Sequence, residues 1–347
     1  MSDFHSIANL GWQAFFQQQL SLDEWDTCHP VRVINQHRNQ LMVTDGNTEH
    51  SLPITPSMPS LVVGDWLLLN EQLQFHRSLD RKTRFARKAA GSKIAEQLIA
   101  ANVDTALIVC SMNADFNLSR LERFLSLVNS AGAEPVIVLS KSDLTADSDR
   151  FIQQVRQLDP LLMVEAVNCL DRDSLESLSP WLKTGTTLAV LGSSGVGKST
   201  LINSLQGSEQ QATQGIREDD AKGRHTTTSR TLVSLPGGAL ILDTPGMREL
   251  QLADCAEGIS QTFSDIDALA QQCRYSDCSH HNEPGCAVKA ALDNGTLDER
   301  RLNNYQKLQR EERFNSASLA ERRGADKAFG QFIKRTQQQA KHLKGRD

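Results

Sequence analysis

The chain has 347 residues, of which 39% are hydrophobic and 23% are charged, and its formal net charge is −5. This composition predicts a soluble globular protein of roughly two or three domains, and the acidic balance excludes a generic polyanion binder. No apolar run reaches the roughly 18 residues of a membrane helix, so we expect no membrane contact, and residues 1–20 lack the basic start of a secretion signal. Seven cysteines, an odd number, predict a reducing cytoplasmic location.

Residues 1–27 predict a short helical extension. Its apolar residues fall on one side, so we expect it to dock on a neighbouring domain, with partner binding as the alternative. These residues are Leu10, Trp12, Phe15, Phe16 and Leu20.

A region of short β-forming runs follows the extension. Residues 31–34, 40–43 and 61–69 read as strands, with a turn at 45–47. Several strands in so short a segment predict a small barrel of the OB type at residues 28–88, and an SH3-like barrel fits the periodicity equally well. The barrel leads into a basic segment, Arg77 to Lys93, which has seven basic residues and one acid.

From there to residue 252 the chain alternates strands and helices, which predicts a parallel α/β sheet covered by helices on both faces. We assign this domain to residues 89–252. The expected strands are 104–110, 135–139, 161–166, 187–191, 231–235 and 239–242, and the expected helices are 118–131, 148–157, 174–182 and 198–206.

The strand predicted at 135–139 ends in Ser140, Lys141, Ser142 and Asp143. A strand-terminal [NT]-K-x-D places a carboxylate opposite the N1–H and exocyclic amine of guanine, a donor pair that adenine lacks. Ser140 stands where Asn is usual, so guanine selectivity is expected to depend mainly on Asp143. A capped helix start is the alternative interpretation.

A phosphate-binding motif, G-x-x-x-x-G-K-[ST], occupies residues 192–200 between a predicted strand and a predicted helix. Its glycines let backbone N–H groups surround a polyphosphate at the positive end of the helix. Lys198 would reach the β- and γ-phosphates, and the hydroxyl of Ser199 would bind Mg²⁺. The segment consists of Gly192, Ser193, Ser194, Gly195, Val196, Gly197, Lys198, Ser199 and Thr200.

Two further segments are typical of a nucleotide switch. Asp243 ends a predicted strand and begins D-T-P-G, so its carboxylate could hold a water of the Mg²⁺ shell while the N–H of Gly246 contacts the γ-phosphate. Residues 207–228 lack periodicity and predict a long loop. Within it, Thr227, or the threonine on either side, could complete the Mg²⁺ coordination when the γ-phosphate is present.

The guanine motif precedes the phosphate motif, whereas common small GTPases have the opposite order. If both belong to one pocket, the domain is circularly permuted, and the switch segments end directly against residues beyond 250.

Four metal-binding side chains lie close together near the C-terminus. Cys273, Cys278, His280 and Cys286 form a Cys₃His set, which predicts one structural Zn²⁺ per chain with no open catalytic position. His281 is an alternative ligand. We expect this mostly helical domain to span residues 253–347 and to end in a basic tail.

With these motifs in this order, the sequence resembles the RsgA/YjeQ/YloQ family of circularly permuted GTPases over residues 28–340. The resemblance implies an OB-type barrel, a circularly permuted P-loop GTPase domain and a zinc-binding helical domain. It also implies a GTPase of 30S ribosomal subunit maturation, monomeric in our expectation, that converts GTP to GDP and binds 16S rRNA through the barrel and the zinc domain. In such proteins a hydrophobic residue, here Met247, replaces the usual water-orienting Gln, and His225 is the candidate for that role.

Two other functions fit parts of the pattern. A P-loop enzyme of another class would treat ATP and GTP alike, and a nucleic-acid-binding module with a structural nucleotide would hydrolyse neither. The guanine motif at 140–143 favours the GTPase.

Overall fold

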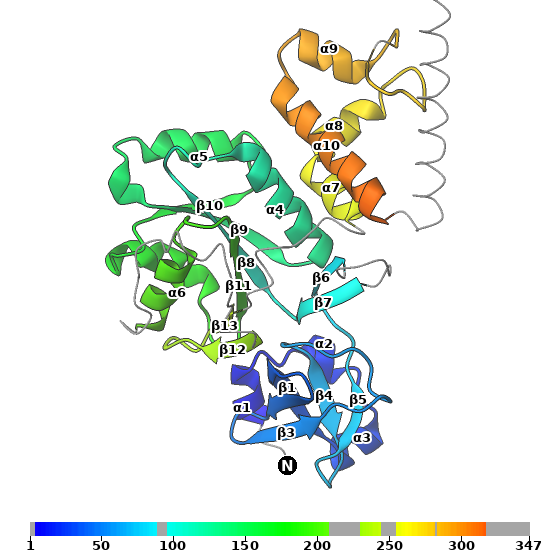
Figure 1. The fold of residues 1–347 in the computed structure, drawn as a ribbon, viewed down its shortest axis with the longest axis vertical. Helices are drawn as coiled ribbons and strands as arrows, with labels where there is room; N and C mark the ends of the chain where they lie inside the picture. The colour runs from blue at the N-terminus through cyan, green and yellow to red at the C-terminus, as the bar shows by residue number, and fades with distance from the viewer. Residues whose placement is uncertain (1–3, 89–95, 208–229, 244–254, 282, 317–347) are drawn as a thin grey trace, which may run out of the picture.

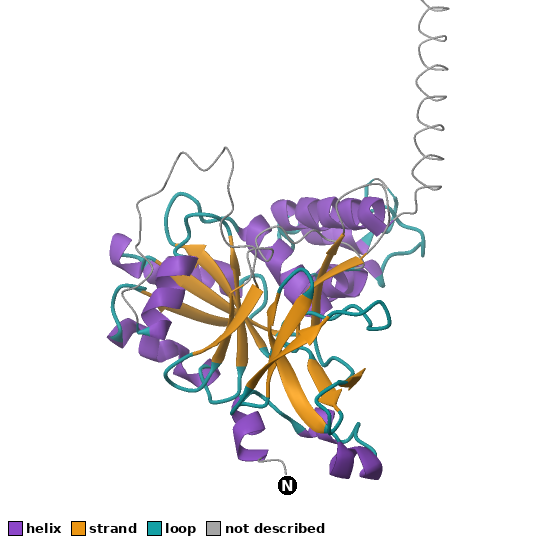
Figure 2. Cartoon of the chain, turned by 60° about the horizontal axis from the view of Figure 1, so that its bottom comes forward, coloured by secondary structure: helices purple, strands orange, loops and turns teal. Residues whose placement is uncertain are grey.

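The computed structural model describes residues 4–88, 96–207, 230–243, 255–281 and 283–316. A barrel, an α/β sheet and a group of C-terminal helices follow one another along the chain (Figure 1). Seen from below, the strands of the first two regions lie together in the centre with helices around them (Figure 2). Within the described ranges, every helix is too short or too polar to cross a membrane.

The N-terminal segment forms three short helices, α1 (Phe4–Asn9), α2 (Ala14–Gln17) and α3 (Leu22–Thr27). As predicted, its apolar side docks on the barrel. Phe16 is 1% exposed, and its ring centroid lies 5.7 Å from that of Trp66 in the barrel. Around this pair pack Leu10, Trp12, Phe15 and Leu20.

The barrel consists of antiparallel strands. The second and fourth strands both pair with the first, the third pairs with the second, and the fifth with the fourth, which is the order of an OB-type barrel. The strands are β1 (His29–Gln36), β2 (Gln40–Thr44), β3 (Glu49–Pro53), β4 (Trp66–Leu69) and β5 (Phe75–Ser78).

The α/β region contributes six strands in the order β10-β9-β8-β11-β13-β12. All are parallel except β12, which runs antiparallel to β13 because a short turn connects the two. The strands are β8 (Thr105–Ser111), β9 (Glu134–Ser140), β10 (Met163–Val167), β11 (Thr187–Gly192), β12 (Arg230–Ser234) and β13 (Leu240–Asp243).

Three helices of this region lie where the sequence predicts them: α4 (Leu118–Ala131), α5 (Ser148–Arg156) and α6 (Lys198–Gln206). The fourth, expected over 174–182, is a 3₁₀ helix, η2 (Asp173–Trp181), with Pro180 inside it. Proline has no backbone N–H and disfavours the α conformation of the preceding residue, so Pro180 opposes an α-helix at the C-terminal end of this segment.

Backbone pairing joins the barrel to the α/β sheet. Residues 35–36 of β1 pair with residues 230–231 of β12, so one path of hydrogen-bonded strands runs through both regions. Between them, part of the basic segment forms β6 (Arg84–Lys88), which pairs in an antiparallel ribbon with β7 (Glu96–Ala101).

Arg32 of β1 lies at the centre of this junction and is 1% exposed. Its guanidinium donates to Leu10 O of the N-terminal segment, to Gly64 O of the barrel and, at 2.9 Å, to Asn102 O at the entry to the α/β region. Burial lowers the pKa of Arg32 to about 10. One buried side chain therefore ties together three segments that are distant in the sequence.

The C-terminal helices pack against α4 of the α/β region (Figure 1). Gly258 permits a close crossing of α4 and α7, because a Cβ there would lie 2.2 Å from Ser126 O. The helices are α7 (Ala256–Thr262), α8 (Ser264–Ala270), α9 (Ala287–Asp293) and α10 (Glu299–Ser316).

Candidate nucleotide-binding site and metal centre

The phosphate motif lies on the turn between β11 and α6, as its strand and helix context predicts. Gly192 has φ of +142°, and a Cβ there would lie 2.3 Å from Val109 O on the neighbouring strand β8. Gly197 forms the N-cap of α6 with φ of +96°. Both positions need glycine, because other residues rarely adopt positive φ and the first has no room for a side chain. We call residues 192–200 the phosphate loop.

Lys198 begins α6 and folds back over the phosphate loop. It is 8% exposed, and its ammonium donates to Gly192 O at 2.8 Å and also to Ser193 O. The ammonium thus already lies at the loop, where a polyphosphate would accept its hydrogen bonds in place of these carbonyls. Ser199 follows it in the first turn and is exposed.

The predicted guanine motif, residues 140–143, forms a second loop, which we call the guanine loop. It follows β9 directly, and Lys141 adopts left-handed φ of +62° there. Two side chains of this loop contact the phosphate loop: Ser140 Oγ donates to Val196 O at 2.6 Å, and Lys141 Nζ donates to Gly195 O at 2.8 Å. The two loops, which lie more than fifty residues apart in the sequence, therefore meet at one edge of the sheet.

The side chain of Ser140, which stands where Asn is usual in the motif, faces the phosphate loop. The side chain is 0% exposed and its hydroxyl points to the phosphate loop, so it connects the two loops. Asp143 is exposed on the same loop. The missing Asn therefore does not break the link between the loops, because a serine hydroxyl supplies the donor.

A third loop completes this edge. It follows β10, and its Cys169 O accepts a 2.6 Å hydrogen bond from Ser204 Oγ of α6. Burial raises the pKa of the Cys169 thiol to about 11, and the negative charge of nearby Asp143 adds to the shift. At this pKa the thiol stays neutral at pH 7 and serves as packing.

The switch residues are placed only in part. Asp243 ends β13, whose backbone pairs with β11 beside the phosphate loop. His225, Thr227 and Gly246 lie outside the described residues.

One polar residue at this site had no motif to identify it. Arg120 lies in the first turn of α4, and its Nη1 donates to Ser193 Oγ of the phosphate loop at 3.1 Å. Its position after the β8 strand was the available signal, since carboxyl ends of parallel strands meet at the ligand-binding edge.

The four predicted metal ligands converge. The ligand atoms of Cys273, Cys278, His280 and Cys286 all lie within 4.8 Å of one another. The sulfurs of Cys273 and Cys286 are 3.9 Å apart, and His280 Nδ1 is 3.7 and 3.5 Å from them. His281 is not among the converging groups.

The distances among Cys273, His280 and Cys286 fit zinc, and Cys278 lies near enough to be the fourth ligand. A tetrahedral ion with Zn–S of about 2.3 Å and Zn–N of about 2.0–2.1 Å requires S···S of about 3.8 Å and S···N of about 3.6 Å. His280 reaches the cluster from a left-handed backbone position, φ +63°, and Cys286 caps α9 by accepting the N–H of Lys289 at 3.3 Å. The cluster can therefore hold one tetrahedral metal ion.

Comparison with known proteins places the chain in a family. A family model described as RsgA GTPase matches residues 78–253. The small ribosomal subunit biogenesis GTPase RsgA 2 of Vibrio parahaemolyticus is 56% identical over 335 residues, covering 96% of this chain and 93% of the relative. The corresponding protein of Mesorhizobium japonicum, small ribosomal subunit biogenesis GTPase RsgA, is 44% identical over 95% of this chain and 96% of its own.

Two solved structures are similar in fold. YjeQ from Thermotoga maritima superposes with a TM-score of 0.61 at 26% identity, covering 81% of this chain and 97% of YjeQ. YloQ, whose structure is described as a circularly permuted GTPase, gives a TM-score of 0.57 at 23% identity, covering 84% and 96%. With the two loops of the predicted nucleotide motifs joined at one edge of the sheet, a Cys₃His cluster and relatives matching over nearly their full length, this chain belongs to the RsgA family of GTPases.

Proposed function

We propose that this chain binds GTP with Mg²⁺ between the guanine loop and the phosphate loop and hydrolyses it to GDP and phosphate. The observation that carries the proposal is the pair of side-chain hydrogen bonds, Ser140 to Val196 O and Lys141 to Gly195 O. The guanine loop and the phosphate loop can bind one nucleotide only if the distance between them matches that between its base and its phosphates. These two hydrogen bonds fix that distance.

In this proposal each loop has a separate task. The exposed carboxylate of Asp143 accepts the two guanine donors, and Ser140 and Lys141 keep its loop in place. Lys198 exchanges its carbonyl partners for the β- and γ-phosphates, and Ser199 Oγ binds Mg²⁺. Asp243 holds a water of the Mg²⁺ shell.

The remaining roles fall outside the described residues. We assign the γ-phosphate contact to Gly246, the nucleotide-dependent Mg²⁺ ligand to Thr227, and the orientation of the attacking water to His225.

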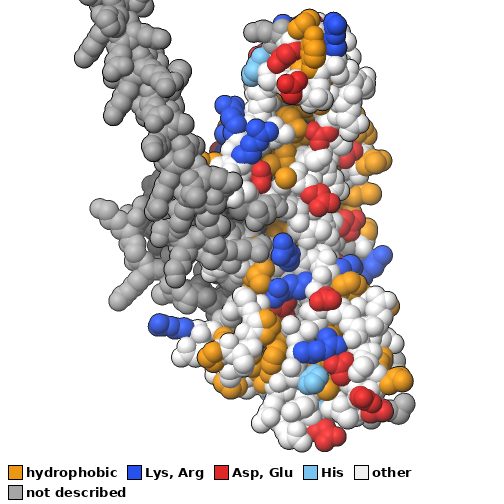
Figure 3. Space-filling view, turned by 90° about the vertical axis from the view of Figure 1, so that its right-hand side faces the viewer, with side chains coloured by type: hydrophobic (Ala, Val, Ile, Leu, Met, Phe, Trp, Pro, Cys, Tyr) orange, Lys and Arg blue, Asp and Glu red, His pale blue; other side chains and the backbone are white. Residues whose placement is uncertain are grey.

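We infer that this GTP hydrolysis serves maturation of the 30S ribosomal subunit. The names of the relatives describe those proteins as small ribosomal subunit biogenesis GTPases. The chain would act as a cytoplasmic monomer and contact 16S rRNA through a barrel domain (28–88) and a zinc domain (253–347), on either side of a GTPase domain (89–252). Lys and Arg side chains lie in small groups along one face from the C-terminal helices to the barrel, with acidic residues between them (Figure 3). Cations spaced along a face can each neutralise a phosphate and so position an RNA on that face.

The zinc domain offers the clearest of these surfaces. A cavity of ≈ 450 Å³ beside the Cys₃His cluster is lined by Arg310 and Arg313 of α10 and by His281. These side chains could donate to an RNA phosphate, while the metal would hold the loop that presents the histidine.

The first test is hydrolysis of GTP and, in parallel, of ATP, with and without purified 30S subunits. We expect slow turnover of GTP that 30S subunits stimulate strongly, and no comparable turnover of ATP. Lys198→Ala should lower GTP hydrolysis on the order of 10²-fold, since it removes a positive charge that stabilises the negative charge of the transition state. Lys183→Ala, an exposed lysine at the opposite end of β11, is the matched control.

Equal hydrolysis of ATP and GTP without a response to 30S subunits would point to another class of P-loop enzyme. A Lys198→Ala variant with normal activity would remove the phosphate loop from the mechanism.

The metal is tested separately. We expect one zinc per chain by elemental analysis of the purified protein, and loss of that zinc in Cys286→Ala, because three ligands leave the tetrahedral site open. Cys28→Ala, at a buried cysteine outside the cluster, should retain it. Equal zinc content in the two variants would contradict the assignment.

A further inference from the structure

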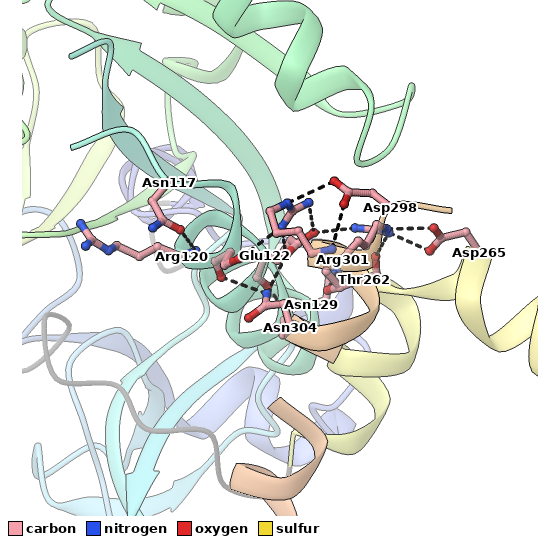
Figure 4. A network of polar contacts seen from close by, with 12 residues as sticks. Asn117, Arg120, Glu122, Asn129, Thr262, Asp265, Asp298, Arg301 and Asn304 are labelled. Carbon is pink, nitrogen blue, oxygen red and sulfur yellow. Dashed lines mark hydrogen bonds and ion pairs between the residues drawn. The ribbon is translucent and has the colours of Figure 1, made fainter. Parts of the chain in front are cut away.

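Helix α4 has one end at the phosphate loop. Asn117 caps it, its Oδ1 accepting the N–H of Arg120 at 3.0 Å, and this fixes the start of the helix beside the nucleotide site. From that first turn the exposed side chain of Arg120 reaches Ser193 Oγ at 3.1 Å. In Figure 4 it points away from the cluster of polar contacts that the same helix forms with the C-terminal region.

The next residues of α4 hold the C-terminal helices. Glu122 is 0% exposed, and its carboxylate accepts from Arg300 at 2.9 Å and from Arg301 at 2.9 Å, with Asn304 as a third donor. Arg301 in turn forms a bidentate pair with Asp265 of α8 at 2.7 and 2.8 Å (Figure 4). The carboxylate thus connects α4 to two helices of the C-terminal region.

Two further contacts prevent the C-terminal region from sliding on α4. Arg123 forms two 2.6 Å hydrogen bonds with Glu311 of α10. Gly258 of α7 lies directly on the backbone of α4 at Ser126. A displacement of the first turns of α4 would therefore be felt by the C-terminal helices, since packed helices resist continuous deformation.

We propose that Arg120 is a positioning residue that couples nucleotide occupancy of the phosphate loop to the seating of the C-terminal helices on α4. This inference rests on the proposed function, because the ligand is the polyphosphate of a guanine nucleotide. The bound phosphates bring several negative charges to the loop and favour a guanidinium held at Ser193. The contact then restrains the first turn of α4, and the Glu122 and Arg123 contacts extend that restraint to α10.

This coupling through side chains differs from a coupling along the polypeptide chain. Residues 244–254 connect β13 to α7 along the chain, whereas Arg120 works through side-chain contacts of a helix that precedes the phosphate loop in the sequence. By linkage, any nucleotide that tightens the C-terminal helices must also bind more tightly when those helices are seated.

The test compares hydrogen exchange of α10 with and without GDP in the full-length protein. In the wild type, GDP should slow exchange of residues 299–316 by about two- to fivefold, the range expected for one exposed charged contact. Arg120→Gln and Ser193→Ala remove the contact from its two sides and should abolish the slowing. Arg120→Lys, which keeps the charge, should retain part of the GDP-dependent slowing.

A matched control and direct binding measurements separate the possible results. Arg156→Gln removes an exposed arginine from the far end of α5 and should respond to GDP like the wild type. Equal GDP-dependent slowing in Arg120→Gln and the wild type would overturn the coupling and leave the GTPase assignment intact. A wild type that fails to bind GDP in a fluorescent-nucleotide titration would overturn both.

Discussion

The α/β sheet is joined to its two neighbours by different kinds of interaction. On the barrel side the joint is made of backbone: β1 pairs with β12, and the guanidinium of Arg32 binds carbonyls of three segments. On the C-terminal side it is made of helices packed on α4 and of side-chain ion pairs, with Glu122 buried among Arg300, Arg301 and Asn304.

This difference indicates which of the two interfaces can change its geometry when a nucleotide binds. Backbone pairing fixes register, and a shift of one residue would reverse every side chain of the strand. A helix held by ion pairs can tilt while its contacts persist, because long side chains follow small displacements. We therefore expect the barrel to keep its place on the sheet and the C-terminal helices to be the responsive part.

The largest effect should come from breaking the C-terminal joint. Glu122→Ala leaves two arginines without their buried carboxylate, and removing one partner of a buried pair costs about 3–5 kcal/mol. Hydrogen exchange should show this loss in α7 and α10, with the strands of the barrel unchanged. Glu257→Gln, at an exposed carboxylate of α7, should have little effect. If Glu122→Ala destabilised the barrel equally, the two joints would not be independent.

A smaller effect is expected at the barrel joint. Arg32→Met keeps much of the volume but leaves Leu10 O and Asn102 O without this donor, whereas Gly64 O still accepts from Asn102 Nδ2 at 3.0 Å. Orphaned buried carbonyls should lower the free energy of unfolding by about 2–3 kcal/mol.

Urea unfolding followed by tryptophan fluorescence measures it, since the rings of Trp12 and Trp66 lie 4.9 Å apart beside Arg32. Arg38→Met, at an exposed position beyond β1, is the control. A variant as stable as the wild type would show that strand pairing alone holds this joint.

The smallest effect concerns a partly buried ion pair between the N-terminal helices and the barrel. Arg77 donates to both oxygens of Glu24, at 2.6 and 3.0 Å, and this interaction, opposed in part by burial, lowers the pKa of Glu24 to about 2. Because the folded pKa lies below the unfolded one, the contribution is complete above about pH 4.5 and is lost as the pH falls toward 2.

Glu24→Gln should therefore lower stability at pH 7 by at most about 1 kcal/mol, and the difference from the wild type should shrink as the pH falls below 4.5. Urea unfolding at pH 7 and pH 4 would measure this difference. Glu71→Gln, at an exposed carboxylate, should show no such trend. A constant difference between Glu24→Gln and the wild type would show that the ion pair is not its source.

The sequence by itself determined most of the local structure. The hydrophobic patterns placed β1, β2, the strands of the α/β region and α4, α5 and α6, because burial sets those patterns directly. The run at 61–69 was expected as one strand but is a strand only over Trp66–Leu69, and β3, β5, β6 and β7 were not predicted. The Cys₃His spacing predicted a cluster whose atoms do converge, since all four ligands lie within fourteen residues. The helix expected at 174–182 is present as a 3₁₀ helix, a type that periodicity alone does not distinguish from an α-helix.

Only the tertiary structure decided which distant residues meet. No local pattern shows that Ser140 binds Val196 O, that β1 pairs with β12, or that Arg120 reaches Ser193. These contacts depend on strand order and on the direction in which each helix leaves the sheet. The local sequence around a serine or an arginine is the same whatever lies opposite it in the fold, so its partner is known only when the chain is folded.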